Sequence, residues 1–188
     1  IGTNEFSESS NGLGYSNLIY IFIRIKLFLN DIKNKGTLIN ILFIEEPESH
    51  LHPQIQSTFF EKMHHILEEA SNIVKIISTH SSYILASADI DSIRYFCTSN
   101  KINIKSMKTF LDEKDSFSDF IKKYFKISNC DLFFADKAVF IEGASERILF
   151  PQFISKIDEL SVENNLSKQN ISVIEVGGRY AHIFFDLI

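Results

Sequence analysis

The sequence feature that constrains the fold most is a short apolar run, residues 39–44, which ends in two adjacent carboxylates, Glu45 and Glu46. The run is rich in isoleucine and too short to span a membrane, which predicts a strand buried on both faces of a parallel sheet. Ligands of open α/β sheets bind beyond the carboxyl ends of such strands. Two acids there are unfavourable unless they hold a cation or a polarised water. Adjacent strand residues point to opposite faces, so the two acids are expected to do different jobs.

A solvated acidic turn after a strand is the alternative interpretation of these acids, and the flanking segments bear on the choice. A helical pattern runs from Pro53 to about residue 70, and its apolar stripe consists of Ile55, Phe59, Met63, Ile66 and Leu67. A second apolar strand, residues 73–77, completes a β-α-β unit, for which a right-handed crossover is expected. His80 follows directly beyond this strand, either within a capped turn or as a functional group.

A glycine-rich segment precedes the acidic strand and leads into a helix. Residues 6–17 are rich in Ser, Asn and Gly, and residues 16–30 form a helical pattern that is apolar nearly all round. Such a helix is expected to be mostly buried. Glycines such as Gly12 and Gly14 let backbone N–H groups approach a ligand, and a helix N-terminus favours an anion. Alone, this turn is most often a capped helix start, but its place ahead of the acidic strand favours a phosphate site.

Several of these features resemble the motifs of one ATPase class. Residues 41–47, Ile-Leu-Phe-Ile-Glu-Glu-Pro, resemble the Walker B motif of the ABC-type ATPases, a branch that includes SMC and RecF-like proteins. The resemblance places Glu45 on the Mg²⁺ side of the site and makes Glu46 the base that aligns the attacking water. Most of the superfamily has the shorter Asp in the first place, so Glu45 is expected to contact the metal directly or through water. By the same resemblance, His80 is the switch histidine that senses the γ-phosphate of ATP.

The same resemblance also implies contacts between protomers. Ser10, Gly12 and Gly14 take the place of the signature loop, which contacts the γ-phosphate of ATP held by the other protomer. Residues 49–53 take the place of the D-loop, which crosses the dimer interface, so self-association through the ATPase part is expected. His50 and His52 also suggest a zinc site, but no Cys or further ligand is spaced to complete it.

A second strand that ends in an acid lies near residue 142. Residues 137–141 form a short apolar strand that ends in Glu142 and Gly143, and Glu146 follows at the start of a helical pattern. This segment resembles the first motif of Toprim domains, which coordinate Mg²⁺ and cut or rejoin phosphodiester bonds. The resemblance makes Glu142 and Glu146 ligands of Mg²⁺ or Mn²⁺, and Glu142 the residue on which cleavage depends. A carboxylate that caps the helix is the alternative for Glu146.

The remaining segments are expected to form a hairpin, a linker and a helix interrupted by proline. Residues 91–97 and 102–105 are predicted to pair as a β-hairpin. Residues 112–116 are charged and polar and mark a domain edge. A helical apolar stripe follows, made of Phe117, Phe120, Ile121, Tyr124 and Phe125, with Lys122, Lys123 and Lys126 opposite. A solvated face is the first interpretation of these lysines, and a DNA-facing patch is the alternative. Pro151 is expected to kink the last helix or to mark its start.

The composition and net charge of the chain limit which classes of function are expected. The 188 residues are 45% hydrophobic and 23% charged, so the chain can bury a core as one domain or two small ones. The net charge of −5 gives no global attraction to nucleic acid, so any DNA contact must come from a local basic patch. Cys97 and Cys130 fit no metal or redox spacing, which suits a reducing compartment. The sequence shows no secretory signal and no membrane segment, so a cytoplasmic location is expected.

Taken over its whole length, the sequence resembles the OLD-family (overcoming lysogenisation defect) nucleases, which include the nuclease subunits of Gabija anti-phage systems. The segment Ser-x-x-Gly-x-Gly-Tyr-Ser-Asn and the Glu-Val-Gly-Gly segment at residues 175–178 match this family. The implied fold is α/β. It would place the C-terminal part of an ABC-type ATPase domain over residues 1–112, a helical linker over residues 113–135 and the start of a Toprim domain over residues 136–188.

The function implied by the resemblance is ATP-regulated cleavage or nicking of DNA in bacterial anti-phage defence, with ATP and Mg²⁺ as cofactors and a partner defence protein as a further contact. The sequence contains no G-x-x-x-x-G-K-[ST] phosphate loop, and no Asp-x-Asp strand follows residue 178. The chain is therefore expected to be a fragment that is inactive alone. The alternative is a DNA clamp or sensor of the ABC and SMC kind, which holds DNA without cutting it. An inactive remnant is a third interpretation.

Overall fold

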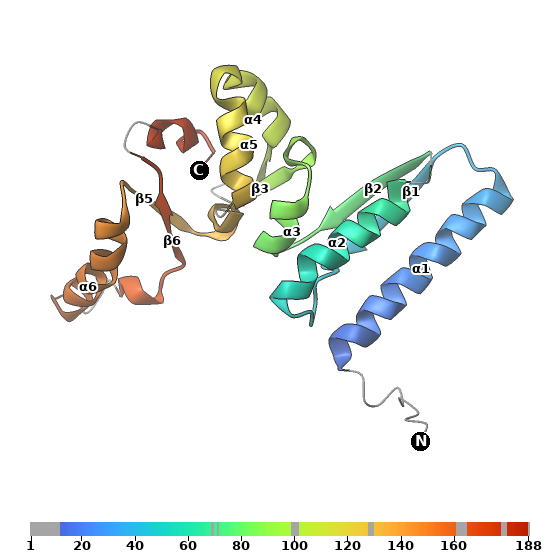
Figure 1. Ribbon diagram of the computed structural model, residues 1–188, viewed down its shortest axis with the longest axis horizontal. Helices are drawn as coiled ribbons and strands as arrows, with labels where there is room; N and C mark the ends of the chain where they lie inside the picture. The colour runs from blue at the N-terminus through green and yellow to red at the C-terminus, as the bar shows by residue number, and fades with distance from the viewer. Residues whose placement is uncertain are drawn as a thin grey trace, which may run out of the picture. The chain divides into compact units, whose positions relative to one another are not determined.

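The computed structural model describes residues 12–68, 70, 72–98, 102–127, 130–160, 165–177 and 180–187. The chain divides into two compact units, Ile1–Ser87 and Ala88–Ile188, each with its own helices and strands. The predicted α/β fold class is confirmed, because each unit contains a parallel strand pair joined through a helix (Figure 1). Among the described residues, no helix combines the length and the apolar character that a membrane span requires.

The first unit contains the predicted β-α-β arrangement. It consists in order of α1 (Leu13–Lys35), β1 (Asn40–Glu45), α2 (Pro53–Glu68), β2 (Ile73–Ser78) and α3 (Ser82–Ser87). β1 and β2 pair in parallel, with Asn40 opposite Ile73 and Glu45 opposite Ser78. Because the strands are parallel and in this register, both carboxyl ends lie at the same edge of the sheet.

The core of the first unit forms around α2, which lies alongside the two strands (Figure 1). Pro53 is the first residue of this helix, as predicted, since its missing N–H is not needed there. Phe59, Met63 and Leu67 of the predicted stripe are buried, and Phe60 is buried with them. The ring of Phe59 meets the ring of Phe22 on α1 edge to face, with centroids 5.4 Å apart.

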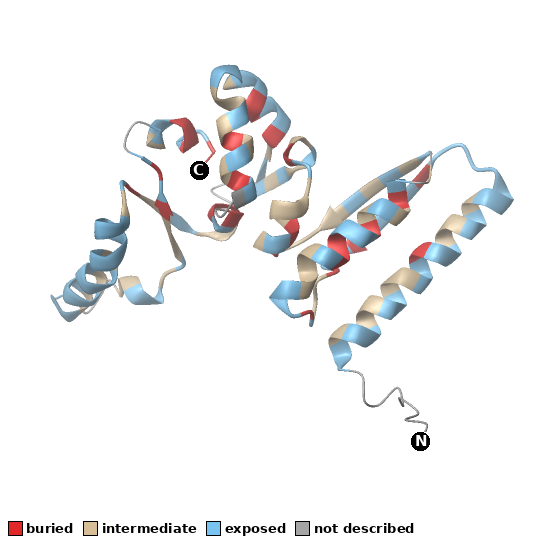
Figure 2. Cartoon of the chain, in the orientation of Figure 1, coloured by how far each residue is buried: buried red, intermediate tan, exposed pale blue. Residues whose placement is uncertain are grey.

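Two sequence-based expectations about burial in this unit are wrong. β1 is not buried on both faces: Ile41 is 62% exposed and Phe43 is 59% exposed, whereas Ile44 on the other face is buried. α1 is not mostly buried either, because Ile25 is its one buried residue among those described (Figure 2). The helix is also longer than predicted and ends at Gly36, which adopts φ 59° as its C-cap. Ile41 and Phe43 therefore lie on a face of the sheet that the described elements of this unit leave open.

The second unit begins with a short helix and the predicted hairpin. η2 (Ile90–Ser92) leads into β3 (Arg94–Thr98), which pairs antiparallel with β4 (Ile102–Ser106). The predicted hairpin is confirmed, and its loop, residues 99–101, lies outside the described residues. α4 (Met107–Glu113), η3 (Asp115–Phe117) and α5 (Ser118–Ile127) follow, with Lys114 between the first two.

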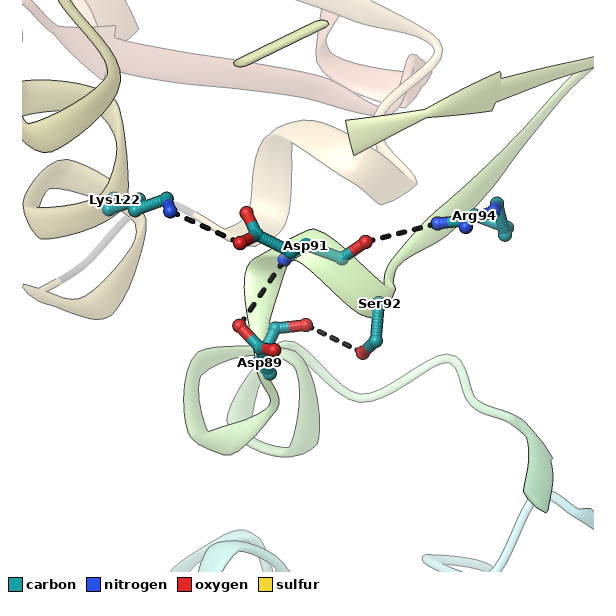
Figure 3. A network of polar contacts seen from close by, with 5 residues as sticks. All are labelled: Asp89, Asp91, Ser92, Arg94 and Lys122. Carbon is teal, nitrogen blue, oxygen red and sulfur yellow. Dashed lines mark hydrogen bonds and ion pairs between the residues drawn. The ribbon is translucent and has the colours of Figure 1, made fainter. Parts of the chain in front are cut away.

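Asp91 of η2 connects the hairpin to α5. Its carboxylate pairs with the Lys122 ammonium at 3.2 Å, and its backbone carbonyl accepts a hydrogen bond from Arg94 at 3.2 Å (Figure 3). Asp89 holds the same turn, accepting from the backbone N–H of Asp91 and from the hydroxyl of Ser92 (Figure 3). Lys122 therefore has a structural partner within the unit, whereas Lys123 and Lys126 are exposed.

A second parallel strand pair completes this unit. η4 (Cys130–Phe134) precedes β5 (Lys137–Ile141), α6 (Ala144–Leu160), η5 (Leu166–Lys168), β6 (Ile171–Glu175) and η6 (Ala181–Phe184). β5 and β6 are parallel, with Ile141 opposite Glu175. Pro151 lies inside α6 and does not mark its start. The boundaries predicted after residues 112 and 135 both fall within this unit and stay predictions about domain limits.

Aromatic rings form much of the core of the second unit. Phe184 is fully buried, and its ring lies 5.8 Å from Phe125, 5.0 Å from Tyr124 and 6.2 Å from Phe140. Ile121 and Phe125 of the predicted α5 stripe are buried, as expected. This cluster ties α5 to β5, and so positions the strand whose end carries Glu142.

Candidate functional site

The first candidate site lies where β1 and β2 end. Glu45 is the last residue of β1 and pairs with Ser78, and the next backbone N–H, that of Glu46, donates to the Ser78 carbonyl at 3.0 Å. Glu46 adopts φ 42° and His50 φ 66°, left-handed conformations that non-glycine residues seldom take. Such strain clusters at functional sites, where the surrounding structure holds it in place. The turn after β1 is therefore fixed by backbone hydrogen bonds and shaped by two strained residues.

The structure brings two predicted site residues together at this edge. Nε2 of His80 lies 3.3 Å from Oε1 of Glu46. The His80 side chain is 80% exposed and that of Glu46 is 51% exposed, so both are open to a ligand. A carboxylate next to an imidazole can take up a proton or orient a water, and the imidazole can donate to a phosphate oxygen.

A third acid, Glu48, belongs to the same edge and was not singled out from the sequence. Its Oε1 accepts one hydrogen bond from the Thr79 hydroxyl and one from the His80 backbone N–H, each at 2.7 Å. Its Oε2 is buried without a hydrogen-bond partner among the described residues. The available signal was a third acid, Glu48, in the Glu-Glu-Pro-Glu segment directly after the strand.

The donor set at this edge fits Mg²⁺. Ser78 Oγ is buried and has no hydrogen-bond partner within the described part of the chain, and its residue stands opposite Glu45. Hydroxyl and carboxylate oxygens are the ligands that Mg²⁺ prefers, and this ion keeps several waters, so it needs few protein ligands. Over the residues described, no group of three His, Cys, Asp or Glu residues could hold a metal alone. The zinc alternative at His50 and His52 therefore has no completing ligand there.

Gly14 is required by packing against the turn after β1. A Cβ at this position would lie 2.3 Å from the His50 carbonyl oxygen, far inside contact distance. The neighbouring Asn17 side chain donates to the Ser49 carbonyl at 3.3 Å. Gly12, in contrast, has open space around its Cβ position. The start of α1 and the D-loop-like turn thus touch, while Ser10 lies outside the described residues and the nucleotide contacts of this loop stay a prediction.

The second candidate site lies at the carboxyl ends of β5 and β6. Glu142 follows β5 and is exposed, and Glu146 is exposed in the first turn of α6. Oε2 of Glu146 lies 3.9 Å from the Cβ position of Gly143, so its carboxylate lies over the residue that follows Glu142. Two exposed carboxylates around one turn are an oxygen donor set of the kind that Mg²⁺ or Mn²⁺ binds.

Glu175, at the end of β6, has structural partners. Its Oε2 pairs with the Arg147 guanidinium at 3.3 Å, and its backbone carbonyl accepts from the Tyr124 hydroxyl at 2.9 Å. Burial raises the pKa of Tyr124 to about 12; nearby Arg147 lowers it and Glu175 raises it further. The phenol therefore stays protonated and serves as a hydrogen-bond donor that fixes the edge of this sheet.

Comparisons with known proteins match both halves of the chain. Residues 2–85 match the model of an AAA ATPase domain, and residues 133–188 match that of the overcoming lysogenization defect protein-like TOPRIM domain. Among curated proteins, the chain is 28% identical to Endonuclease GajA of Bacillus cereus (strain HuB5-5), over 96% of this chain and 29% of that protein.

Two further curated proteins are named as OLD nucleases. The chain is 27% identical to Old nuclease of Escherichia phage P2, over 86% of this chain and 27% of that protein. It is 24% identical to OLD nuclease of Thermus scotoductus, over 89% of this chain and 31% of that protein. The chain thus spans less than a third of the length of each of these relatives. Residues 2–85 are thus similar to an AAA ATPase domain and residues 133–188 to an OLD-like TOPRIM domain, and over most of its length the chain is similar to the OLD-family nucleases, the resemblance that its motifs predicted.

Proposed function

We propose that this chain is part of a longer ATP-binding, ATP-regulated DNA endonuclease that acts in bacterial anti-phage defence. The observation that carries the proposal is that one chain holds acids after the first strand of two parallel pairs: Glu46 beside His80 in the first unit, and Glu142 after β5 with Glu146 in the first turn of α6 in the second. The relatives, of which the chain spans less than a third, support it because their names are those of nucleases. The other elements of both sites would come from the rest of the protein.

In the ATPase half, each residue has a separate task. Glu46 aligns the attacking water and accepts its proton, and His80, whose Nε2 lies 3.3 Å from Oε1 of Glu46, contacts the γ-phosphate. Glu45 and the Ser78 hydroxyl lie on the metal side of this edge. Gly12 and Gly14, with Ser10, face ATP held by a second protomer, so the active form would be a dimer or larger assembly.

In the TOPRIM half, Glu142 and Glu146 hold the metal next to the scissile phosphate of DNA. When bound, Mg²⁺ or Mn²⁺ activates a water and stabilises the leaving oxygen. The exposed position of both acids allows a wide substrate such as a DNA strand to reach them.

Plasmid nicking by the full-length protein tests this proposal. Glu142→Gln is expected to abolish cleavage in Mg²⁺ or Mn²⁺, because it removes a charged ligand and keeps the size of the side chain. Glu159→Gln, an exposed change near the end of α6, is the matched control and should cut like the wild type. If Glu142→Gln cuts as well as the control, the nuclease proposal is wrong and a DNA clamp or sensor becomes the better account.

A further inference from the structure

The residue that links the turn after β1 to the loop after β2 is Glu48. Its Oε1 receives both the Thr79 hydroxyl and the His80 backbone N–H, each at 2.7 Å. Hydrogen bonds to a carboxylate are short and about twice as strong as neutral ones. One bond holds the Thr79 side chain and the other holds the His80 backbone, which the regular pairing of β2 no longer holds because that strand ends at Ser78.

The turn that carries Glu48 is itself held firmly. The Ser49 N–H donates to the Glu46 carbonyl at 3.0 Å, and the Leu51 N–H donates to the Glu48 carbonyl at 2.9 Å. The Glu46 N–H reaches across to the Ser78 carbonyl at 3.0 Å. Glu48 therefore extends from a rigid turn, and a group bound to its carboxylate is held in a defined place relative to Glu46.

The surroundings of Glu48 do not favour a carboxylate for stability alone. Its Oε2 is buried and has no hydrogen-bond partner among the described residues. A buried polar atom without a partner is unfavourable, and this cost offsets part of what the two hydrogen bonds to Oε1 contribute. A carboxylate kept at this cost to stability calls for a role that an apolar side chain cannot fill.

The His80 side chain is 80% exposed, so side-chain packing does little to fix it. The place from which this side chain extends is set by the backbone of His80, whose N–H is bound by Glu48. We propose that Glu48 is a positioning residue that keeps His80 beside Glu46. The rate of ATP hydrolysis then depends on the hydrogen bond between the Glu48 carboxylate and the His80 N–H. The inference rests on the proposed function, because it concerns the turnover of that same site.

The first test measures how strongly Glu48 protects the His80 backbone amide, and it does not depend on enzyme activity. In the full-length protein labelled with ¹⁵N-histidine, Glu48→Met should greatly accelerate hydrogen exchange of the His80 backbone amide, because Met has nearly the shape of Glu and no acceptor oxygen. Glu68→Met, which removes the partner of His64 in another exposed Glu–His pair, should leave that amide unchanged. Unchanged protection of His80 in Glu48→Met would overturn the proposal, whether or not the protein hydrolyses ATP.

The second test separates positioning from stability. Glu48→Met should lower kcat for ATP by about 10²-fold with little change in KM, the size that a small misplacement can have. The melting temperature should fall modestly, because the Thr79 hydroxyl and the His80 N–H lose their acceptor, so turnover is compared at a temperature at which both proteins are fully folded. Glu48→Gln should recover most of the turnover, because its amide oxygen can still accept both hydrogen bonds. If Glu48→Gln is as slow as Glu48→Met, charge and not positioning matters, and the proposal fails.

A double variant tests whether Glu48 acts through His80. If Glu48 acts through His80, then Glu48→Met combined with His80→Ala should be no slower than His80→Ala alone. Additive losses would show that Glu48 acts elsewhere. A wild-type protein that hydrolyses no ATP refutes the proposed function, and the amide exchange of His80 then decides alone whether Glu48 holds this loop.

Discussion

At the scale of residues, the ATPase side of the account depends on the contact between Nε2 of His80 and Oε1 of Glu46, 3.3 Å apart. The two residues are 34 positions apart in the sequence, and the parallel register of β1 with β2 brings them together. Each is exposed enough to meet a ligand from solvent. The proposed base, Glu46, thus lies next to the imidazole that is proposed to donate a hydrogen bond to a phosphate oxygen.

Replacing Glu46 tests the base. In the full-length protein, Glu46→Gln should bind ATP with unchanged affinity and hydrolyse it about 10²–10⁴-fold more slowly, the range typical of a positioned general base. Phosphate release under saturating ATP is the measurement. Glu61→Gln, an exposed change on α2, serves as control. Equal turnover in Glu46→Gln and Glu61→Gln would mean that Glu46 is a turn residue only.

Gly14 and Gly12 form a matched pair for testing the contact between α1 and the turn after β1. Gly14→Ala should lower the free energy of unfolding by about 1–3 kcal/mol, the usual range for overpacking, because the new Cβ meets the His50 carbonyl oxygen at 2.3 Å. Gly12→Ala should change stability little, since no atom lies within 4 Å of its Cβ position. Denaturant unfolding of both variants measures this. Equal stability of the two would contradict the packing described here.

At the scale of elements, both candidate sites use one arrangement. A parallel pair, β1 with β2 or β5 with β6, ends at a common edge, and an acid follows or closes the first strand. Ligands of α/β sheets bind at such edges. The order of these elements could be predicted from the sequence, because apolar runs, Pro53 at a helix start and acids after strands are local signals.

What the sequence could not supply depends on distant parts of the chain. The run at residues 39–44 predicted burial on both faces, but Ile41 and Phe43 are exposed because burial depends on what covers a strand. Glu48 was missed because its partners, Thr79 and His80, lie more than thirty positions away. The ligand contact predicted for Gly14 stays a prediction, but its close approach to the His50 carbonyl could not be foreseen, because it joins distant parts of the chain.

The short helix η4 allows a prediction about pH. Burial raises the pKa of the Cys130 thiol from 9.0 to about 12. The unfolded chain ionises this thiol near its ordinary value, so its contribution to stability is complete below pH 9 and is lost as pH rises towards about 12. Urea unfolding across this window should show a smaller fall in stability for Cys130→Ala than for the wild type. Cys97→Ala is the control, and the same pH dependence in all three proteins would contradict the effect.

At the scale of the whole molecule, the proposal requires more than one copy. If Ser10, Gly12 and Gly14 meet ATP held by a second protomer, a subunit with Gly12→Asp and a subunit with a defective phosphate loop should complement each other. A mixed assembly would then regain ATP hydrolysis that neither variant shows alone. Size-exclusion chromatography confirms that the mixed assembly forms. A mixed assembly that stays inactive would argue against a site shared between protomers.

The central claim is that one protein carries two separable chemistries, ATP hydrolysis in the first unit and DNA cleavage in the second. The most direct measurement records phosphate release and plasmid nicking on the same preparations of full-length wild type, Glu46→Gln and Glu142→Gln, each with a thermal melt. The account predicts that Glu46→Gln loses phosphate release, and that Glu142→Gln loses nicking while it keeps release and its melting temperature. Nicking by Glu142→Gln at the wild-type rate, or loss of phosphate release in a folded Glu142→Gln protein, would contradict it.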